Sequence, residues 1–111
     1  MARIIWSPTA RHRLDEIVNF IAQDSPSAAR EVHQSLLRAV RRIGRWPHSG
    51  VWVGARYEHL AGLETDYRVV VIRPYLVFYR VREHAGGEVL VLTVRHGAQL
   101  PPAAEVLTSA E

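Results

Sequence analysis

The chain has 111 residues, of which 48% are apolar and 23% are charged, so it is long enough to bury one ordinary hydrophobic core and we expect a single domain. It contains no cysteine, which excludes a disulfide framework, zinc sites with thiolate ligands and a cysteine nucleophile. The net charge is +3, and all 14 basic residues are arginine; this bias either suits an acidic partner or a nucleic acid or reflects the codon usage of a GC-rich genome.

Two amphipathic helices are predicted after a short β-type run at residues 3–6. Ser7-Pro8 and Ser25-Pro26 are both helix-start signals, because a serine side chain caps free backbone N–H groups and proline is tolerated at the first helical position. Apolar residues recur at three- and four-residue steps after each signal; they are Ala10, Leu14, Ile17, Val18 and Ile21, then Ala29, Val32, Leu36, Val40 and Ile43. We expect helices that end near Asp24 and by Trp46-Pro47 and form an antiparallel hairpin.

The far side of the second helix carries a basic cluster. Four arginines fall within about two helical turns; they are Arg38, Arg41, Arg42 and Arg45. Such a cluster suits an acidic partner. A run of this kind is also typical of a helix face that is merely solvated.

The composition changes after Pro47. Residues 47–54 combine proline, serine and glycine with large apolar residues, so we expect an irregular loop anchored by Trp52. Three β-rich segments follow at 56–73, with a break at Gly62, then at 75–82 and 89–96. Pro74 and Gly86-Gly87 mark short turns, which join antiparallel neighbours. The predicted fold is α+β with the order β-α-α-β-β-β, in which the helical hairpin packs on one face of an antiparallel sheet.

Residues 1–97 are predicted to form the single domain. The tail, residues 98–111, contains Pro101-Pro102 and ends in small polar residues, so we expect at most one marginal turn at 103–107 and a mobile segment unless a partner orders it. The first residues lack a secretory signal pattern, and no apolar run approaches the roughly 20 residues of a membrane-spanning helix. We therefore expect a cytoplasmic protein without membrane contact.

The sequence gives no support for a metal site, a nucleotide-binding loop or a serine hydrolase. The histidines show no paired spacing on one helix, so no metal site is expected. The glycines are too dispersed for a phosphate-binding loop, so no nucleotide or other cofactor is expected. The serines cap helices or occupy helix, loop and tail positions, which does not suit a Ser/His/Asp hydrolase.

What remains is a set of polar residues in the strands, several of which alternate with valines and would give the sheet a cationic face. They are Tyr67, Arg68, Arg73, Tyr79, Arg80, Arg82, Arg95 and His96. An exposed face of this kind binds RNA through phosphate pairing and base stacking. Arginines on an open sheet also serve simply to keep it soluble.

The order of several short motifs is typical of a known family. Residues 67–81 contain Pro74-Tyr75 followed by Tyr79-Arg80-Val81, and residues 89–97 end in Arg95-His96-Gly97. Upstream stretches that fit the same pattern are Trp6 to Ala10, Asp15 to Ile17, Ser25 to Ala29 and Trp46 to Gly50. Over roughly residues 3 to 100 the chain resembles the ParE/RelE superfamily of toxins from type II toxin-antitoxin systems.

The superfamily divides by target. RelE-like members are similar to ribosome-dependent messenger RNA endonucleases, and ParE-like members inhibit DNA gyrase by trapping its cleaved-DNA state. RelE-like nucleases carry basic residues on the first two strands of the meander and at the end of the last strand. At those places this sequence keeps Arg68, Arg95 and His96 but has Val70 and Leu76 where charges are expected. The resemblance therefore favours the ParE-like branch, a stoichiometric inhibitor without catalytic residues.

The ParE-like interpretation implies three partners: DNA gyrase as the target, a cognate ParD-like antitoxin, and operator DNA reached only through that antitoxin. An acidic C-terminal segment of the antitoxin would wrap the hairpin and the sheet and fold on binding. The partner-binding candidates are Arg38, Arg41, Arg42, Arg45, Trp52, Arg73, Arg80 and Arg82.

Two alternatives stay open. The first is a ribosome-dependent endoribonuclease in which His96 acts as acid or base while Arg68 and Arg95 bind phosphate. His96 equally suits a strand-end turn, where its side chain hydrogen-bonds backbone. The second alternative is a non-toxic antitoxin-binding module or operon corepressor.

Overall fold

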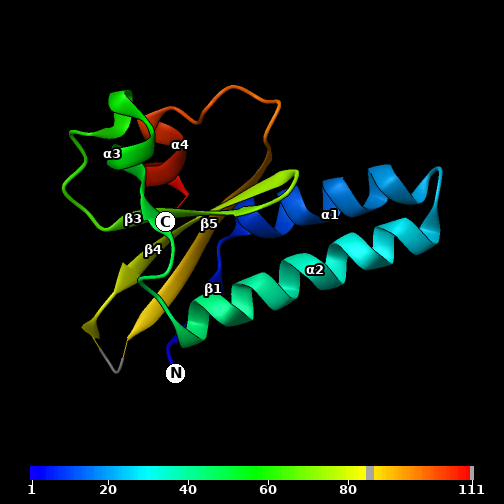
Figure 1. Cartoon of the computed structure of the whole chain (residues 1–111), viewed down its shortest axis with the longest axis horizontal. Coiled ribbons are helices and arrows are strands. Elements are labelled where there is room, and N and C mark those ends of the chain that lie inside the picture. The colour runs from blue at the N-terminus through cyan, green and yellow to red at the C-terminus, as the bar shows by residue number, and fades with distance from the viewer. Residues whose placement is uncertain (85–86, 111) are drawn as a thin grey trace.

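The computed structural model describes residues 1–84 and 87–110, and in it a helical hairpin extends from one side of a five-stranded sheet (Figure 1). The elements are β1 (Arg3–Trp6), α1 (Pro8–Ala22), α2 (Pro26–Arg45), β2 (Val51–Trp52), α3 (Val53–Arg56), the 3-10 helix η1 (Glu58–Leu60), β3 (Tyr67–Ile72), β4 (Tyr75–Arg82), β5 (Glu88–His96) and α4 (Ala104–Ser109). The predicted α+β class is confirmed, as is the predicted order of the two long helices and the four longer strands.

Both helices of the hairpin begin at the predicted Ser-Pro signals. The side-chain oxygen of Ser7 accepts a hydrogen bond from Ala10 N at 3.0 Å, and that of Ser25 accepts one from Ala28 N at 3.1 Å. The buried Ser7 hydroxyl also donates to Leu92 O at 2.9 Å. The residue that starts α1 therefore also fixes that helix to β5.

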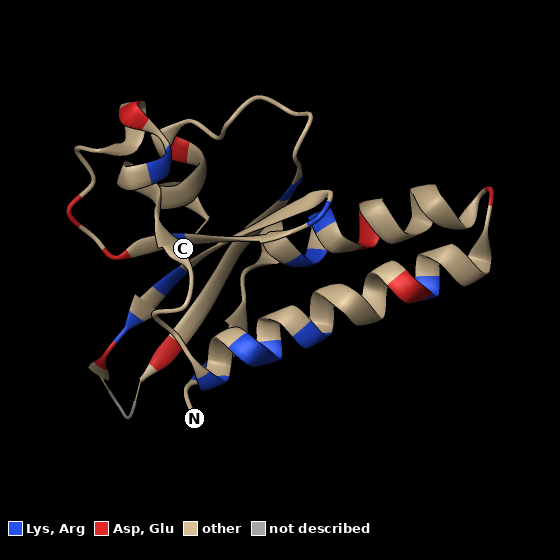
Figure 2. Ribbon diagram, in the orientation of Figure 1, with Lys and Arg blue, Asp and Glu red and all other residues tan. Residues whose placement is uncertain are grey.

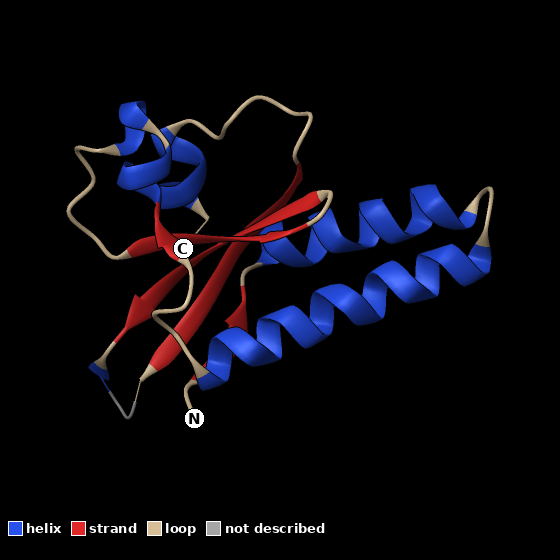
Figure 3. Ribbon diagram, viewed as in Figure 1, coloured by secondary structure: helices blue, strands red, loops and turns tan. Residues whose placement is uncertain are grey.

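The strand order in the sheet is β1-β5-β4-β3-β2 (Figure 3). Strands β3, β4 and β5 form the predicted antiparallel meander. Strand β1 pairs with β5 in parallel, with Ile4 opposite Val89, and the long connection that parallel pairing needs is supplied by the hairpin and the meander. Of the predicted turn at Gly86-Gly87, Gly86 lies outside the described residues, and Gly87 has a φ of 91°, a conformation that glycine adopts readily.

The segment predicted to start a strand at Arg56 is helical instead. Helices α3 and η1 occupy residues 53–56 and 58–60, and β3 begins only at Tyr67. Val53 and Leu60 are fully buried in a shared core, and such tertiary packing overrides a weak local β propensity. Val53 rather than Trp52 anchors this part of the chain, because the Trp52 side chain remains 37% exposed.

The sheet buries apolar side chains on both faces. On the hairpin side, Leu36 of α2 packs with Val77 and Val91. On the other side, Phe78 and Leu92 pack with residues of α3, η1 and α4, because successive side chains of a strand point to opposite faces. The molecule therefore has three layers, and the predicted open cationic face is wrong: the second face is an apolar core.

The tail differs from the mobile segment that the sequence predicts. Residues 104–109 form α4, which lies beside α3 (Figure 1), and Leu107 is fully buried. His59 Nε2 lies 2.9 Å from the carbonyl of Pro102 and hydrogen-bonds to it. The tail offers too few large apolar residues for a helical period to be visible in the sequence. The apolar site that receives Leu107 exists only once the sheet and α3 have formed.

We expect Leu107→Ala to lower the free energy of unfolding by about 2–5 kcal/mol, the usual range for truncating a fully buried leucine. Urea unfolding followed by tryptophan fluorescence measures this change. The control is Thr108→Ala, because Thr108 is exposed on the same helix, and it should change stability by less than about 0.5 kcal/mol. Equal stability of the two variants would mean that the tail does not pack in solution.

Candidate functional site

A buried tyrosine fixes the loop between α2 and β2. The Tyr79 hydroxyl donates to the carbonyl of Pro47 at 2.8 Å and accepts from Gly50 N at 2.9 Å. Burial raises the pKa of the Tyr79 phenol, and the hydrogen bond from Gly50 opposes that rise. The phenol therefore stays neutral and keeps the proton that it donates to Pro47. Tyr79, predicted to line an open cationic face, is fully buried on the hairpin side.

Arg68 holds the same loop through its guanidinium group. Its Nε donates to Asp66 Oδ1 at 2.9 Å, and its Nη1 donates to the carbonyls of Gly50 at 2.8 Å and His48 at 3.2 Å. The His48 ring in turn lies 3.7 Å from Asp66 Oδ2 and 3.1 Å from Glu83 Oε1. Three of the five guanidinium donors are thereby engaged. Arg68 acts as a clamp of the loop in this geometry.

The sheet separates Arg68 from Arg95. Arg68 is directly opposite Tyr79, which packs against the hairpin. Arg95 is directly opposite Leu76, which belongs to the core on the other face. Directly opposed residues of an antiparallel pair share a face, so the two guanidinium groups point away from one another. The structure does not bring the two predicted phosphate-binding arginines together.

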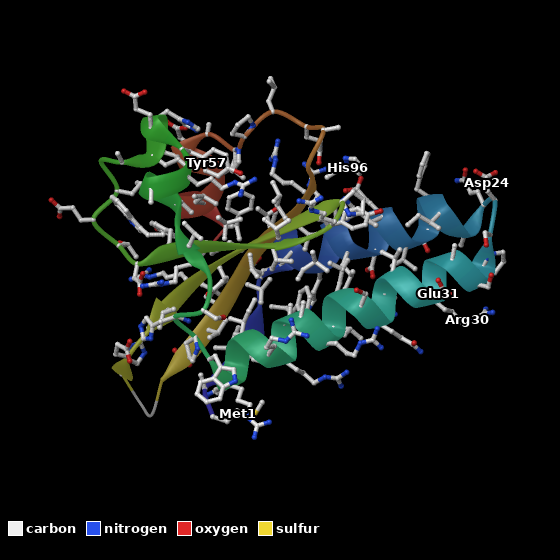
Figure 4. All side chains as sticks on the ribbon, viewed as in Figure 1. Met1, Asp24, Arg30, Glu31, Tyr57 and His96 are labelled. Carbon is white, nitrogen blue, oxygen red and sulfur yellow. The ribbon has the colours of Figure 1, made fainter. Side chains whose placement is uncertain are left out.

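His96 lies at the end of β5, on the side of the sheet near α1 (Figure 4). Its Nδ1 accepts a hydrogen bond from Ala98 N at 2.9 Å, and its backbone N–H donates to Gln99 Oε1 at 2.8 Å. The imidazole packs edge-on against Tyr75, with 5.6 Å between the ring centroids. These contacts are those of a strand-end turn, and they leave only Nε2 for other chemistry.

Arg95 precedes His96 and is half-buried. Burial lowers the pKa of its guanidinium, and the positive charge of Arg13 lowers it further. An arginine remains charged at neutral pH even so. Arg95 therefore offers a fixed positive charge but no proton that would transfer near neutral pH.

A cleft of about 610 Å³ opens between α1 and the ends of β4 and β5. It is lined by Arg13, Glu16, Ile17, Phe20, Ile21, Tyr75, Val94, His96 and Gln99. Phe20 is 70% exposed at this cleft, and it is not among the partner-binding residues predicted from the sequence. Two features of the sequence together could have identified Phe20 as a surface contact. It is aromatic, and at helical spacing it lies outside the apolar face of α1 that buries Leu14.

A second groove of about 240 Å³ lies between β1 and α2. Ile4 and Trp6 of β1 form one wall, while Leu37 and Val40 of α2 form the other. Arg41 stands at this groove with its side chain exposed. This groove is therefore apolar with an arginine at its margin, whereas the cleft beside α1 mixes apolar side chains with Arg13, Glu16, His96 and Gln99.

The partner-binding candidates on the strands have different surroundings. Arg82 Nε lies 3.3 Å from Glu88 Oε1, and this carboxylate is also 3.2 Å from His84 Nε2. Glu88 is buried, so Arg82 stabilises a buried charge at this end of the sheet. Arg80 is half-buried on β4, and Arg73 is exposed at the turn before β4.

The candidates on α2 form one surface. Figure 2 shows the basic residues along the half of α2 that leads to β2, and the side chains of Arg38, Arg41, Arg42 and Arg45 are all exposed. Trp52 lies apart from this helix on β2, where its ring covers Gly54 so closely that a Cβ there would lie 2.3 Å from the indole. The predicted basic cluster therefore exists as a surface, and Trp52 is a separate feature.

Two features were sought among the residues that the structure describes: a cluster of metal-ligating side chains and a membrane-spanning helix. Within residues 1–84 and 87–110, no three or more His, Cys, Asp or Glu side chains are grouped so as to hold a metal ion. No helix in those ranges combines the length and apolar character needed to cross a membrane.

Known proteins resemble the chain over almost its whole length. Residues 4–101 match the family described as the ParE toxin of the type II toxin-antitoxin system, parDE. Over 100 residues the chain is 31% identical to Toxin RelE2 of Caulobacter vibrioides, which covers 90% of this chain and 100% of that protein. It is 33% identical over 102 residues to the Sinorhizobium fredii protein Y4kP, with 90% and 93% covered.

A solved structure has the same fold. A chain of the chromosomal ParDE TA system from P. aeruginosa superposes with a TM-score of 0.64 at 19% identity, covering 86% of this chain and 96% of that one. The shared fold agrees with the family match, which spans most of the domain predicted from the sequence. The chain belongs to the family of ParE toxins of type II toxin-antitoxin systems.

Proposed function

We propose that this toxin acts in the cytoplasm as a stoichiometric inhibitor of DNA gyrase and that a ParD-like antitoxin neutralises it. The observation that carries the proposal is the arrangement of the three residues that a ribonuclease would use. Arg68 is engaged in clamping a loop, Arg95 lies on the opposite face, and His96 caps a turn. Catalysis on RNA needs such groups around one phosphate, whereas an inhibitor that occupies a surface of its target does not.

The cleft beside α1 supports the proposed neutralisation. Ile17, Phe20 and Ile21 offer apolar side chains there, beside an exposed pair in which Arg13 Nη1 lies 3.3 Å from Glu16 Oε1. A segment of the antitoxin that carries apolar and acidic residues would bury the apolar side chains and compete with Glu16 for Arg13. Operator DNA enters this proposal only through the antitoxin.

We expect the purified toxin to inhibit supercoiling by DNA gyrase and to accumulate double-strand breaks at near-equimolar amounts. Adding the protein encoded next to it should relieve both effects. A supercoiling and cleavage assay on plasmid DNA measures them, and His96→Ala should inhibit as wild type does. Gyrase that remains fully active, with no trapped breaks, would reject the proposed target.

Ribosome-dependent RNA cleavage is the second candidate, because one relative carries the name Toxin RelE2. This candidate predicts that the toxin cleaves a messenger RNA during translation and that the His96→Ala substitution abolishes the cleavage. Growth arrest on induction without the antitoxin would exclude the remaining alternative, a non-toxic binding module or corepressor.

A further inference from the structure

Helix α2 carries the entire charge surplus of the protein. It contains five arginines and a single glutamate, a net charge of +4, whereas the whole chain carries +3. All the other residues together are therefore slightly acidic, at −1. Soluble surfaces are typically designed with charges of both signs interspersed, so the concentration of positive charge on one helix sets α2 apart from the rest of the molecule.

Four of these arginines form a stripe along one side of the helix, which we call the arginine stripe: Arg38, Arg41, Arg42 and Arg45. At 100° per residue they fall within about 100° of arc and extend for about 10 Å along the axis. The stripe lies opposite the face that buries Leu36, Val40 and Ile43 against the sheet. All four residues are exposed, and Figure 2 marks the basic positions along α2 in blue.

No member of the stripe has an ion-pair or side-chain hydrogen-bond partner among residues 1–84 and 87–110. Arg13, Arg68 and Arg82 each lie against a carboxylate, whereas exposed Arg11 and Arg73 resemble the stripe in having no ion pair among the described residues. The stripe differs from these single arginines in gathering four such side chains on one helix face. The helix dipole accounts for Arg42 and Arg45, which lie in the last turn, but its effect fades beyond that turn. Arg38 and Arg41 have no such role in the fold.

The chemistry of the stripe suits phosphate better than protein. No apolar side chain of α2 lies among the four arginines on that face, where the preceding residues are Glu31, Gln34 and Ser35. The apolar groove between β1 and α2 reaches the stripe only at Arg41, so the stripe itself lacks the apolar centre typical of a protein interface. A guanidinium group binds a phosphate through two parallel hydrogen bonds. A site for single-stranded nucleic acid also needs several exposed aromatic rings in succession, on which the bases stack. In the part of the chain that the structure describes, there is a single such ring next to the stripe, that of Trp46, which is 62% exposed.

We propose that the arginine stripe of α2 binds the phosphate backbone of duplex DNA directly and without sequence preference. This contact goes beyond the expectation that the toxin meets operator DNA only through its antitoxin. It is also independent of the proposed gyrase inhibition, since it needs neither gyrase nor antitoxin.

The test is a fluorescence anisotropy titration of a short labelled DNA duplex of mixed sequence at several salt concentrations, with the toxin alone. Each phosphate neutralised contributes about −0.9 to the slope of log K against log salt, so four arginines predict a slope of about −3 to −4. In the double variant Arg38→Gln and Arg41→Gln the slope should become shallower by about 2, with correspondingly weaker binding at low salt.

The matched control removes the same two charges elsewhere, by Arg11→Gln with Arg56→Gln. Both residues are exposed and lie off α2, on α1 and α3. If the stripe is the site, the control keeps the wild-type slope. If both double variants lose the same DNA affinity and the same salt dependence, the effect comes from net charge alone and the proposal is overturned.

Three other outcomes would overturn it as well. One is no binding by wild type at low salt, and another is tighter binding of a single-stranded probe of the same sequence. The third is unchanged DNA binding in the stripe variant combined with lost affinity for the antitoxin, which would assign the stripe to a protein partner. Circular dichroism of each variant confirms that it is folded.

Discussion

Replacing Gly50 with alanine is expected to lower the free energy of unfolding by about 2–5 kcal/mol, from overpacking and from hydrogen bonds that are lost. An added Cβ would lie 2.5 Å from the Tyr79 hydroxyl oxygen and 2.9 Å from the carbonyl oxygen of Val69. The Val69 oxygen belongs to the backbone of β3 and has little freedom to move. The Tyr79 hydroxyl would have to leave, which breaks its bonds to Pro47 and Gly50.

The effect should extend through the clamp. Arg68 binds the carbonyl oxygens of Gly50 and His48, so a shift of the loop also displaces this guanidinium from its acceptors. A buried donor or acceptor that loses its partner costs about 1–3 kcal/mol. One methyl group therefore disturbs several hydrogen bonds at once.

Urea unfolding measures the loss, and Gly62→Ala is the matched control. A Cβ at Gly62 would meet no atom within 4 Å, so this variant should match the wild type or be slightly more stable. Tyr79→Phe provides a second test, because it removes the hydroxyl without adding volume. Equal stability of the two glycine variants would show that the loop adjusts freely and that the hydrogen bonds do not hold it.

The second large effect is expected at the cleft: Phe20→Glu should weaken antitoxin binding at least about 30-fold, as for an interface residue worth 2 kcal/mol or more. Phe20 is 70% exposed, so its replacement leaves the core intact. A glutamate there removes an apolar contact and also repels an acidic segment of the antitoxin. In cells, co-expressed antitoxin should no longer rescue growth from this variant.

Isothermal titration with the purified antitoxin measures the affinity, and Val51→Glu is the control. Val51 is 51% exposed at the opposite edge of the sheet from β1, so the same change in charge should leave the affinity near that of wild type. Unchanged affinity in Phe20→Glu would place the antitoxin elsewhere. Both variants should still inhibit gyrase when no antitoxin is present. If they do, unchanged antitoxin affinity counts against the cleft as the antitoxin site and not against gyrase as the target.

Local sequence determined the helices and the meander. The serine and proline that start each helix lie within three residues of the N–H groups that they cap, and the apolar period is visible over a few turns. Short turns between β-rich segments fixed the antiparallel order of β3, β4 and β5. The order of the short motifs along the chain was also enough to identify the family.

Contacts between distant segments decided the rest. Nothing near Arg3–Trp6 in the chain indicates that β1 pairs with β5 in parallel, and nothing near Leu107 reveals the core that receives it. The separation of Arg68 and Arg95 depends on strand register, because a shift of one residue moves a side chain to the other face. Propensities, caps and periods are properties of neighbours in sequence, whereas burial and ion pairing are set by which segments the folded chain brings together.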